Sequence, residues 1–255
     1  MIDTHAHLTD RRFNPDRDSV IQRALHQGIT LIICVCSDFG ELDLFYSLLE
    51  KYNFLYGAAG IHPHDAFYWK DLEPKLIKAL EHEKIVALGE VGLDYHYENS
   101  PRTVQKEVFK FQLELAKEKG FPVIIHSRDA MKDTLAILRG EKIHKGVMHC
   151  FSGNEEDMRT CLELGLYISL AGTVTFPKAF NLQKIASSVP LDKLVVETDC
   201  PYLAPQPVRG KRNEPSFLKY VIEKIASIRG LDQRKLTLTT SENAKNLFGL
   251  VHKLS

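Results

Sequence analysis

Two histidines two residues apart lie near the start of this sequence, in the segment His5-Ala6-His7. If this segment is a strand, both imidazoles point to the same side, because side chains alternate along a strand. Two imidazoles arranged in this way can bind one cation. Two polar residues at the end of any strand would give the same pattern, so the pair alone is a weak indication of a metal site.

Four further residues of metal-binding type each follow a short run of uncharged residues. They are Glu90, His126, His149 and Asp199. Each run is predicted to be a strand, and Glu90 is expected at the end of the strand 85–89. In a barrel of parallel strands all carboxyl ends open onto one face, where the active site lies. Such a barrel would bring these residues together with His5 and His7.

Four imidazoles and two carboxylates are more ligands than one tetrahedral cation needs. They predict two divalent metal ions per chain, with Glu90 as the natural bridge, because one carboxylate can give an oxygen to each ion. Mixed nitrogen and oxygen ligands favour zinc, manganese or cobalt over a pure magnesium site. We expect two divalent ions per chain, zinc, manganese or magnesium.

The elements that must position these residues alternate regularly along the chain. The expected strands are 1–7, 30–36, 55–60, 85–89, 122–126, 146–151, 166–171 and 194–198. The expected helices are 17–27, 41–51, 72–82, 105–119, 131–139, 154–164, 181–188 and 214–229, with a terminal helix at 241–250. This order predicts a TIM-type (β/α)8 barrel in one domain, residues 1–255. The alternative is a doubly wound open sheet.

Composition narrows the classes of function. The 255 residues carry 33 Lys and Arg against 33 Asp and Glu, a formal net charge of zero. This argues against a protein that coats duplex DNA through a broad basic surface, but not against a local phosphate site. The five cysteines show no disulfide spacing, so we expect buried free thiols, with Cys150 and Cys200 pointing away from their ligand neighbours. No signal segment or spanning apolar run is visible, and we expect a cytoplasmic protein that binds no membrane.

Seven segments in order along the chain carry these candidate residues. They are IDTHAH (2–7), GIHPH (60–64), GEVGLDY (89–95), HSR (126–128), HCFSG (149–153), ETDCPYL (197–203) and RGKRNEP (209–215). With them the chain resembles the TatD family of metal-dependent deoxyribonucleases, within the amidohydrolase superfamily. The resemblance implies a TIM-type barrel and nuclease action with divalent metals. It also implies His5, His7 and Asp199 on one metal, His126 and His149 on the other, and Glu90 shared.

We therefore expect a deoxyribonuclease, a 3′–5′ exonuclease that hydrolyses phosphodiester bonds at short or single-stranded ends, with no obligate protein partner. Bound metals would lower the pKa of a water molecule from about 16 toward about 7. Asp199, a ligand that can also accept a proton, is the candidate general base. Glu90 and His62 complete the expected catalytic set. His62 is expected to hydrogen-bond a phosphate, with a surface-loop histidine as the alternative.

Several residues are expected around the substrate. Arg128 is a candidate phosphate ligand, unless it pairs with Asp129. Arg209, Lys211 and Arg212 form a cationic loop after the last expected strand, where barrels often bind phosphate, with a solvated charge run as the alternative. Glu197 is expected to support a metal ligand. Four aromatic residues near the rim either stack bases or pack in the core: Tyr95, Tyr97, Phe151 and Tyr202.

Two other functions remain open from the sequence. A metal centre of this kind can also attack carbon, so an acyl hydrolase, such as an aminoacyl-tRNA deacylase, is the first alternative. A metal-bound scaffold without turnover is the second alternative. The complete ligand set, with a carboxylate placed as a base, argues against the scaffold.

Overall fold

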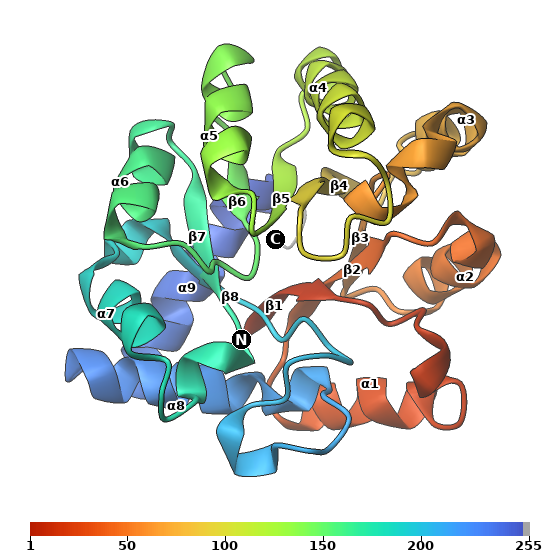
Figure 1. Cartoon of the computed structure of the whole chain (residues 1–255). Coiled ribbons are helices and arrows are strands. Elements are labelled where there is room, and N and C mark those ends of the chain that lie inside the picture. Colours follow the sequence, from red (N-terminus) through yellow and green to blue (C-terminus); the bar gives the residue numbers. More distant parts are fainter. Residues whose placement is uncertain (252–255) are drawn as a thin grey trace.

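The computed structural model describes residues 1–251, so residues 252–255 of the expected domain lie outside the described residues. Eight parallel strands follow one another in sequence order around a barrel, and the helices surround them (Figure 1). The strands are β1 (Ile2–Ala6), β2 (Leu31–Cys36), β3 (Leu55–Ala59), β4 (Ile85–Asp94), β5 (Val123–Arg128), β6 (Gly146–Met148), β7 (Tyr167–Leu170) and β8 (Leu194–Val196). The (β/α)8 barrel predicted from the sequence is confirmed.

Nine α-helices lie among the described residues. They are α1 (Arg17–His26), α2 (Leu42–Lys51), α3 (Trp69–Ala79), α4 (Arg102–Lys119), α5 (Met131–Gly140), α6 (Glu155–Glu163), α7 (Phe180–Ser188), α8 (Leu218–Arg229) and α9 (Gln233–Phe248). A 3-10 helix, η3 (Pro63–Tyr68), leads into α3. Within the described part of the chain, no helix is both long and apolar enough to span a lipid bilayer.

The barrel closes between β1 and the segment that follows β8. The backbone N–H of Asp199 donates to the carbonyl of His5 (3.0 Å), and that of His7 donates to the carbonyl of Cys200 (2.8 Å). The buried Asp3 carboxylate accepts hydrogen bonds from the Thr198 backbone (2.9 Å) and hydroxyl (2.6 Å). These bonds fix the two chain segments that carry His5, His7 and Asp199.

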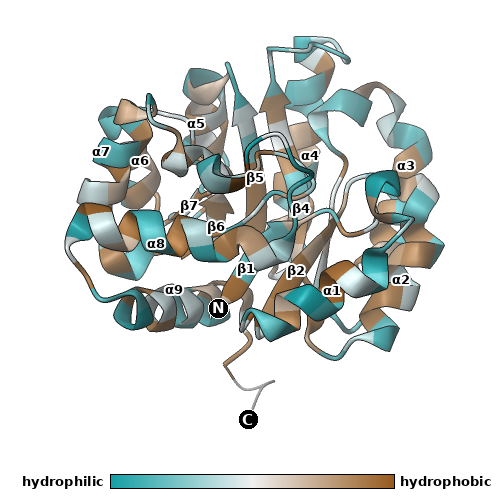
Figure 2. Ribbon diagram, turned by 90° about the horizontal axis from the view of Figure 1, so that it is seen from below, coloured by the Kyte–Doolittle hydropathy of each residue, from teal (hydrophilic) through white to brown (hydrophobic). Residues whose placement is uncertain are grey.

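Apolar side chains fill the barrel and the layer between strands and helices. The strands are largely brown in Figure 2, which means that most of their residues are apolar, as is typical of parallel sheets that are buried on both faces. Inside the barrel, residues such as Ile33, Val35 and Val195 pack with Leu247 and Phe248 of α9. Helix α9 thus covers the amino-terminal end of the barrel, and the carboxyl end of the strands is left to form the site.

Strand β4 is longer than the sequence predicted. It runs from Ile85 to Asp94 rather than ending at residue 89, so Glu90 lies inside the strand and the predicted strand end was wrong. Its register with β5 shifts between Gly89 and Val91. A Cβ on Gly92 would lie 1.9 Å from the carbonyl oxygen of His126, at a φ of 148°. Glycine at this position lets β4 continue close beside β5.

Four helix starts also differ from the prediction by three residues or more. Helix α4 begins at Arg102 rather than 105. Helix α3 begins at Trp69 rather than 72, and α8 begins at Leu218 rather than 214, after a short 3-10 turn that contains Pro215. Helix α9 begins at Gln233 rather than 241. Its threonines have low helix propensity, but the Asp232 side chain caps the helix by accepting from the Lys235 N–H (3.0 Å).

Candidate metal centre

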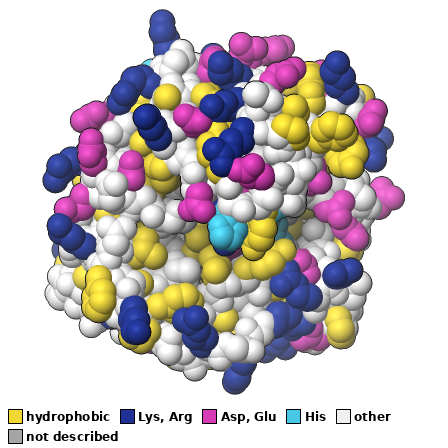
Figure 3. All heavy atoms as spheres, in the orientation of Figure 1, with side chains coloured by type: hydrophobic (Ala, Val, Ile, Leu, Met, Phe, Trp, Pro, Cys, Tyr) yellow, Lys and Arg dark blue, Asp and Glu magenta, His cyan; other side chains and the backbone are white. Residues whose placement is uncertain are grey.

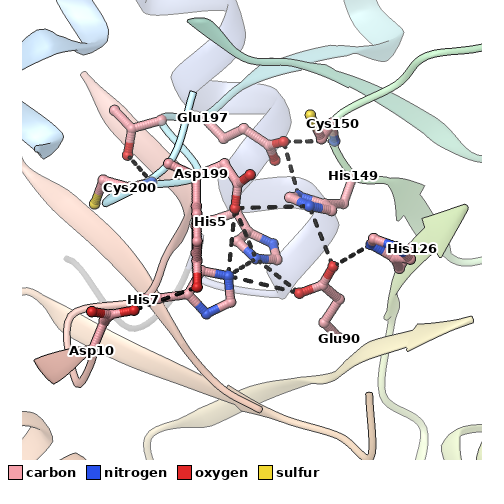
Figure 4. A network of polar contacts seen from close by, with 12 residues as sticks. His5, His7, Asp10, Glu90, His126, His149, Cys150, Glu197, Asp199 and Cys200 are labelled. Carbon is pink, nitrogen blue, oxygen red and sulfur yellow. Dashed lines mark hydrogen bonds and ion pairs between the residues drawn. The ribbon is translucent and has the colours of Figure 1, made fainter. Parts of the chain in front are cut away.

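The six residues predicted to bind metal converge at the carboxyl end of the barrel (Figure 4). His5 and His7 come from the end of β1, Glu90 from β4 and His126 from β5, while His149 and Asp199 follow β6 and β8. Five of them line a cavity of about 1150 Å³, and His5 is fully buried beside them. In Figure 3 this face of the molecule is hollowed at its centre, and histidine is visible in the hollow.

One oxygen of Glu90 faces the two histidines of β1. Glu90 Oε2 lies 3.4 Å from His5 Nε2 and 3.7 Å from His7 Nε2, and the two nitrogens are 3.1 Å apart. Asp199 Oδ1 completes this group, at 3.4 Å from His7 Nε2 and 3.9 Å from His5 Nε2. Two nitrogens and two carboxylates thus point at one small volume.

The other oxygen of Glu90 faces a different pair of histidines. Glu90 Oε1 lies 2.6 Å from His126 Nδ1 and 3.4 Å from His149 Nε2. The His149 ring also stacks on the His5 ring, with centroids 3.6 Å apart. Glu90 therefore stands between the two groups and offers one oxygen to each.

These spacings fit bound cations. Ligand atoms at about 2.0–2.2 Å from a tetrahedral zinc ion are roughly 3.3–3.6 Å apart. The nitrogen and oxygen atoms of the group around His5 and His7 are separated by 3.1 to 3.9 Å. Imidazole nitrogens with carboxylate oxygens are the donor set of zinc and related transition metals. The residues present can hold a divalent metal.

The charges of the site depend on one another. Burial would raise the pKa of Glu90, but His149, His5 and His62 hold that pKa well below its usual value. Burial would lower the pKa of His149, yet Glu197 and Glu90 raise it to about 10. In the same way, Asp94 and Glu90 overcome the effect of burial and raise the pKa of His126 to about 9. The carboxylates of the site are thus ionised, and each is held by imidazoles.

A second set of carboxylates holds the histidines in place. Glu197 Oε1 lies 2.9 Å from His149 Nδ1, and Glu197 also accepts hydrogen bonds from the Cys150 N–H and the Ser169 hydroxyl (2.6 Å each). Asp94 Oδ2 lies 3.3 Å from His126 Nε2. Carboxylates behind histidines in this way orient the rings toward a metal. The geometry agrees with the supporting position expected of Glu197.

A family model described as "TatD related DNase" matches residues 2–249. The chain belongs to the TatD family. It is 44% identical over 251 residues to the uncharacterized metal-dependent hydrolase YabD of Bacillus subtilis, covering 97% of this chain and 98% of that protein. It is 35% identical to the 3′-5′ ssDNA/RNA exonuclease TatD of Citrobacter koseri, covering 98% and 99%.

The fold is that of TatD proteins as well. The crystal structure of a TatD homologue from Escherichia coli, YJJV, superposes with a TM-score of 0.92 at 30% identity and covers 98% of both chains. A TatD-family hydrolase from Entamoeba histolytica gives a TM-score of 0.90 at 24% identity, again over 98% of both chains, and supports the fold alone. The chain is thus a metal-dependent hydrolase of the TatD family.

In this TatD-family site, His62 lies over the cluster rather than in a surface loop. Its Nε2 is 3.7 Å from Glu90 Oε1, and its Nδ1 accepts a hydrogen bond from the His64 backbone (3.2 Å). Burial lowers the pKa of His62 well below its usual value, so the ring is neutral. A neutral ring with Nδ1 as the acceptor carries its proton on Nε2, which faces the cavity.

His64 is a residue of the site that the sequence reasoning did not assign a role. Its Nε2 lies 2.9 Å from the same Asp94 oxygen that contacts His126. The only signal was the spacing of His62 and His64, which repeats the two-residue spacing of His5 and His7.

Arg128 lies on the wall of the cavity. Its guanidinium carbon lies 4.7 Å from the centre of the Tyr97 ring. The alternative partner considered for it, Asp129, contacts His96 Nδ1 instead, at 3.0 Å. Among the described residues Arg128 forms no ion pair, so its charge faces the cavity unpaired.

The cationic loop does not lie where we expected it. Arg209, Lys211 and Arg212 are absent from the described lining of the cavity. Arg212 donates to Asp16 (2.9 Å) and to the Arg12 carbonyl (2.6 Å), and Arg209 lies over the Phe176 ring at 4.2 Å. The loop therefore does not line the cavity as its expected phosphate role requires, and Arg212 anchors it to the segment before α1.

Two other expectations change in the same way. Cys200 is fully buried as expected, but Cys150 lines the cavity. At Cys150 the backbone leaves the extended conformation, with a φ of 43°, so alternation along a strand no longer sets the side-chain direction. Of the rim aromatics, Phe151 is buried and Tyr95 hydrogen-bonds Asp133 (2.7 Å) away from the cavity lining. Tyr97 and Tyr202 are exposed and line the cavity.

Proposed function

We propose that this chain is a divalent-metal-dependent nuclease, a 3′–5′ exonuclease that hydrolyses phosphodiester bonds at short or single-stranded ends of DNA. The observation that carries the proposal is Glu90, whose two oxygens face two separate pairs of histidines. A carboxylate between two such groups is the arrangement of two-metal hydrolases that act on phosphate esters. The relatives named as single-strand exonucleases, at 35% identity, support the choice of substrate.

Two metal ions per chain, of zinc, manganese or magnesium, are part of the proposal. His5, His7 and Asp199 would hold one ion, His126 and His149 the other, and Glu90 both. When bound, the ions supply a water molecule of lowered pKa and positive charge against the phosphoryl oxygens. Proton transfer and hydrogen bonding to the substrate are assigned to side chains of the protein.

Asp199 is the residue that we propose as the general base. Its side chain lies at the mouth of the cluster, 3.4 Å from His7 Nε2. Burial would raise its pKa, but His7 and His149 lower it, so the carboxylate is ionised and can accept a proton from the attacking water. His62, with its proton on Nε2, would donate a hydrogen bond to a phosphoryl or leaving oxygen.

The walls of the cavity carry cations that can bind an anionic substrate, alongside carboxylates such as Asp38, Glu41 and Asp65. Three cations line the cavity: Arg11, Lys75 and Arg128. In the part of the chain that the structure describes, none of the three forms an ion pair. In contrast, Arg12 is neutralised by Asp10 (2.7 Å) and Arg212 by Asp16 (2.8 Å). Unpaired cations around a metal centre attract phosphates.

One experiment tests the proposal directly. Protein stripped with EDTA and then loaded with manganese, zinc or magnesium is given single-stranded DNA labelled at either end, RNA, duplex DNA and a neutral ester. We expect mononucleotides to be released from the 3′ end only when metal is present. Asp199→Asn should slow this release by roughly 10²- to 10⁴-fold, while the exposed Asp43→Asn should not.

The neutral ester distinguishes a nuclease from an acyl hydrolase. Turnover of the ester without cleavage of any nucleic acid would refute the proposed nuclease. Cleavage of DNA that persists after metal removal would refute the proposed mechanism.

A further inference from the structure

Two exposed tyrosines stand on opposite sides of the metal centre. Tyr97 follows β4 and Tyr202 follows β8, and these strands are four places apart in a ring of eight. Both side chains line the cavity, and the residues are 55% and 46% exposed. In Figure 3, hydrophobic side chains border the histidine at the centre of this face. Exposing apolar surface to water is unfavourable, so exposed aromatic rings beside a site often mark a surface that a ligand covers.

Each tyrosine is backed by an arginine. The guanidinium carbon of Arg128 lies 4.7 Å from the Tyr97 ring centre, and that of Arg12 lies 4.1 Å from the Tyr202 ring centre. A guanidinium covers one face of a ring and leaves the other for a second planar group. Arg12 is itself fixed by Asp10, to which its Nε (2.9 Å) and Nη2 (2.7 Å) donate. Tyr202 is therefore a fixed platform.

Each tyrosine also meets a histidine of the site at its edge. The Tyr202 and His7 rings are 5.9 Å apart at 85°, and the Tyr97 and His64 rings are 5.4 Å apart at 89°. His7 belongs to the group on one side of Glu90. His64 reaches the group on the other side through Asp94, which also contacts His126. The two platforms thus flank the cluster from both sides, one beside each end of the Glu90 bridge.

We propose that Tyr97 and Tyr202 form an aromatic clamp that stacks the unpaired bases on either side of the phosphodiester under attack. This inference rests on the proposed nuclease function and names its substrate more closely. Every base presents a π face, so stacking tolerates all sequences but requires that the base be unpaired. The clamp thereby selects single strands, and the unpaired Arg128 is placed to bind a phosphate next to the stacked base.

The test measures binding rather than turnover. Metal-loaded protein is titrated with a single-stranded hexanucleotide that has phosphorothioate linkages, which keep the charge and resist cleavage. A second hexamer has the same linkages but no bases. We expect the wild-type protein to bind the strand with bases more tightly. Tyr97→Leu and Tyr202→Leu should each weaken this binding by roughly 5- to 100-fold and leave the abasic strand nearly unaffected.

Control variants separate stacking from other roles. Tyr97→Phe and Tyr202→Phe keep the ring and should bind as the wild type does. Tyr220→Leu removes a tyrosine that also has a cation over its ring, Lys219 Nζ at 5.1 Å, but that does not line the cavity. It should change neither affinity. A 2-aminopurine base in the strand should be quenched by the wild-type protein and less by either Leu variant.

Equal affinity of the wild-type protein for the two hexamers would overturn the clamp. So would an equal loss for both strands in the Leu variants, or a loss in the Phe variants as large as in the Leu variants. Failure of the clamp and failure of the nuclease proposal can be distinguished. Base-dependent binding without cleavage of an unmodified strand would refute only the proposed reaction, while cleavage with base-independent binding would refute only the clamp.

Discussion

Glu197 Oε1 lies 2.9 Å from Nδ1 of His149, whose Nε2 faces Glu90 Oε1 at 3.4 Å. A carboxylate this close to Nδ1 favours the tautomer that carries its proton on Nδ1, which leaves the lone pair of Nε2 directed at the cluster. Glu197 also accepts from Ser169 and Cys150 and is itself buried, so it cannot easily turn away. Although it has no place in the proposed ligand set, Glu197 determines how one ligand is presented.

This relationship predicts the effect of removing the charge alone. Glu197→Gln should weaken metal binding by roughly 10- to 100-fold, without abolishing it, because the His149 ring remains. Isothermal titration of EDTA-treated protein with zinc measures the affinity. The exposed Glu223→Gln on α8 is the matched control and should bind as the wild type does. Wild-type affinity in Glu197→Gln would show that the contact with His149 has no bearing on the metal.

Substitution of Arg128 by Gln should affect substrate binding, whereas the same substitution of Arg212 should affect only stability. Arg128→Gln should raise the KM for a single-stranded oligonucleotide. It should also reduce the slope of the logarithm of the binding constant against the logarithm of the salt concentration by about 0.7, the value for one phosphate contact. Arg212→Gln should leave KM unchanged and lower the free energy of unfolding by about 1 kcal/mol or less, because its ion pair with Asp16 is partly exposed. Steady-state kinetics at several salt concentrations and urea unfolding measure the two effects.

A change in the KM for the oligonucleotide in Arg212→Gln would show that the loop contacts the substrate. No change of salt slope in Arg128→Gln would remove that arginine from it.

Glu214 provides a pH-dependent contribution to stability away from the site. Its carboxylate accepts from Arg23 Nε (2.9 Å) and Nη2 (2.6 Å). Burial would raise its pKa, but Arg23 and Ser216 lower it below the ordinary value of 4.5. A depressed pKa in the folded state stabilises the fold above pH 4.5, and this contribution is lost as the pH falls through the folded-state pKa.

Glu214→Gln should therefore lower the free energy of unfolding at pH 7 by about 1–2 kcal/mol. The difference from the wild type should shrink as the pH falls below 4.5. Urea unfolding of both proteins between pH 3 and pH 8 tests this. Because both proteins share the metal centre, its own pH dependence cancels in the comparison. A difference that is constant across this range would show that the ion pair with Arg23 does not cause it.

The sequence was sufficient for the residues whose placement follows from chain direction. Each parallel strand delivers its carboxyl end to one face, so His126, His149 and Asp199 were expected together without knowledge of side-chain contacts. Glu90 was placed at a strand end and lies within β4. The error arose because glycines 89 and 92 look like strand breakers in a sequence, whereas here they allow β4 to lie close beside β5.

What the sequence could not predict depends on partners distant along the chain. The pairing of Arg212 with Asp16 spans 196 residues, and no local pattern indicates that this charge is already neutralised. Likewise, the φ of 43° at Cys150 turns that thiol toward the cavity, although alternation predicts the opposite direction. Side-chain direction follows from spacing only where the backbone stays regular.

The metal content of Glu90 variants tests the central claim most directly. Elemental analysis of carefully desalted protein should give two divalent ions per chain in the wild type. Glu90→Ala should lower the occupancy of both sites together, because each oxygen of Glu90 faces a different pair of histidines. The exposed Glu50→Ala should keep both ions. If Glu90→Ala retained two ions and full nuclease activity, Glu90 would not bridge a two-metal centre and the account would be wrong.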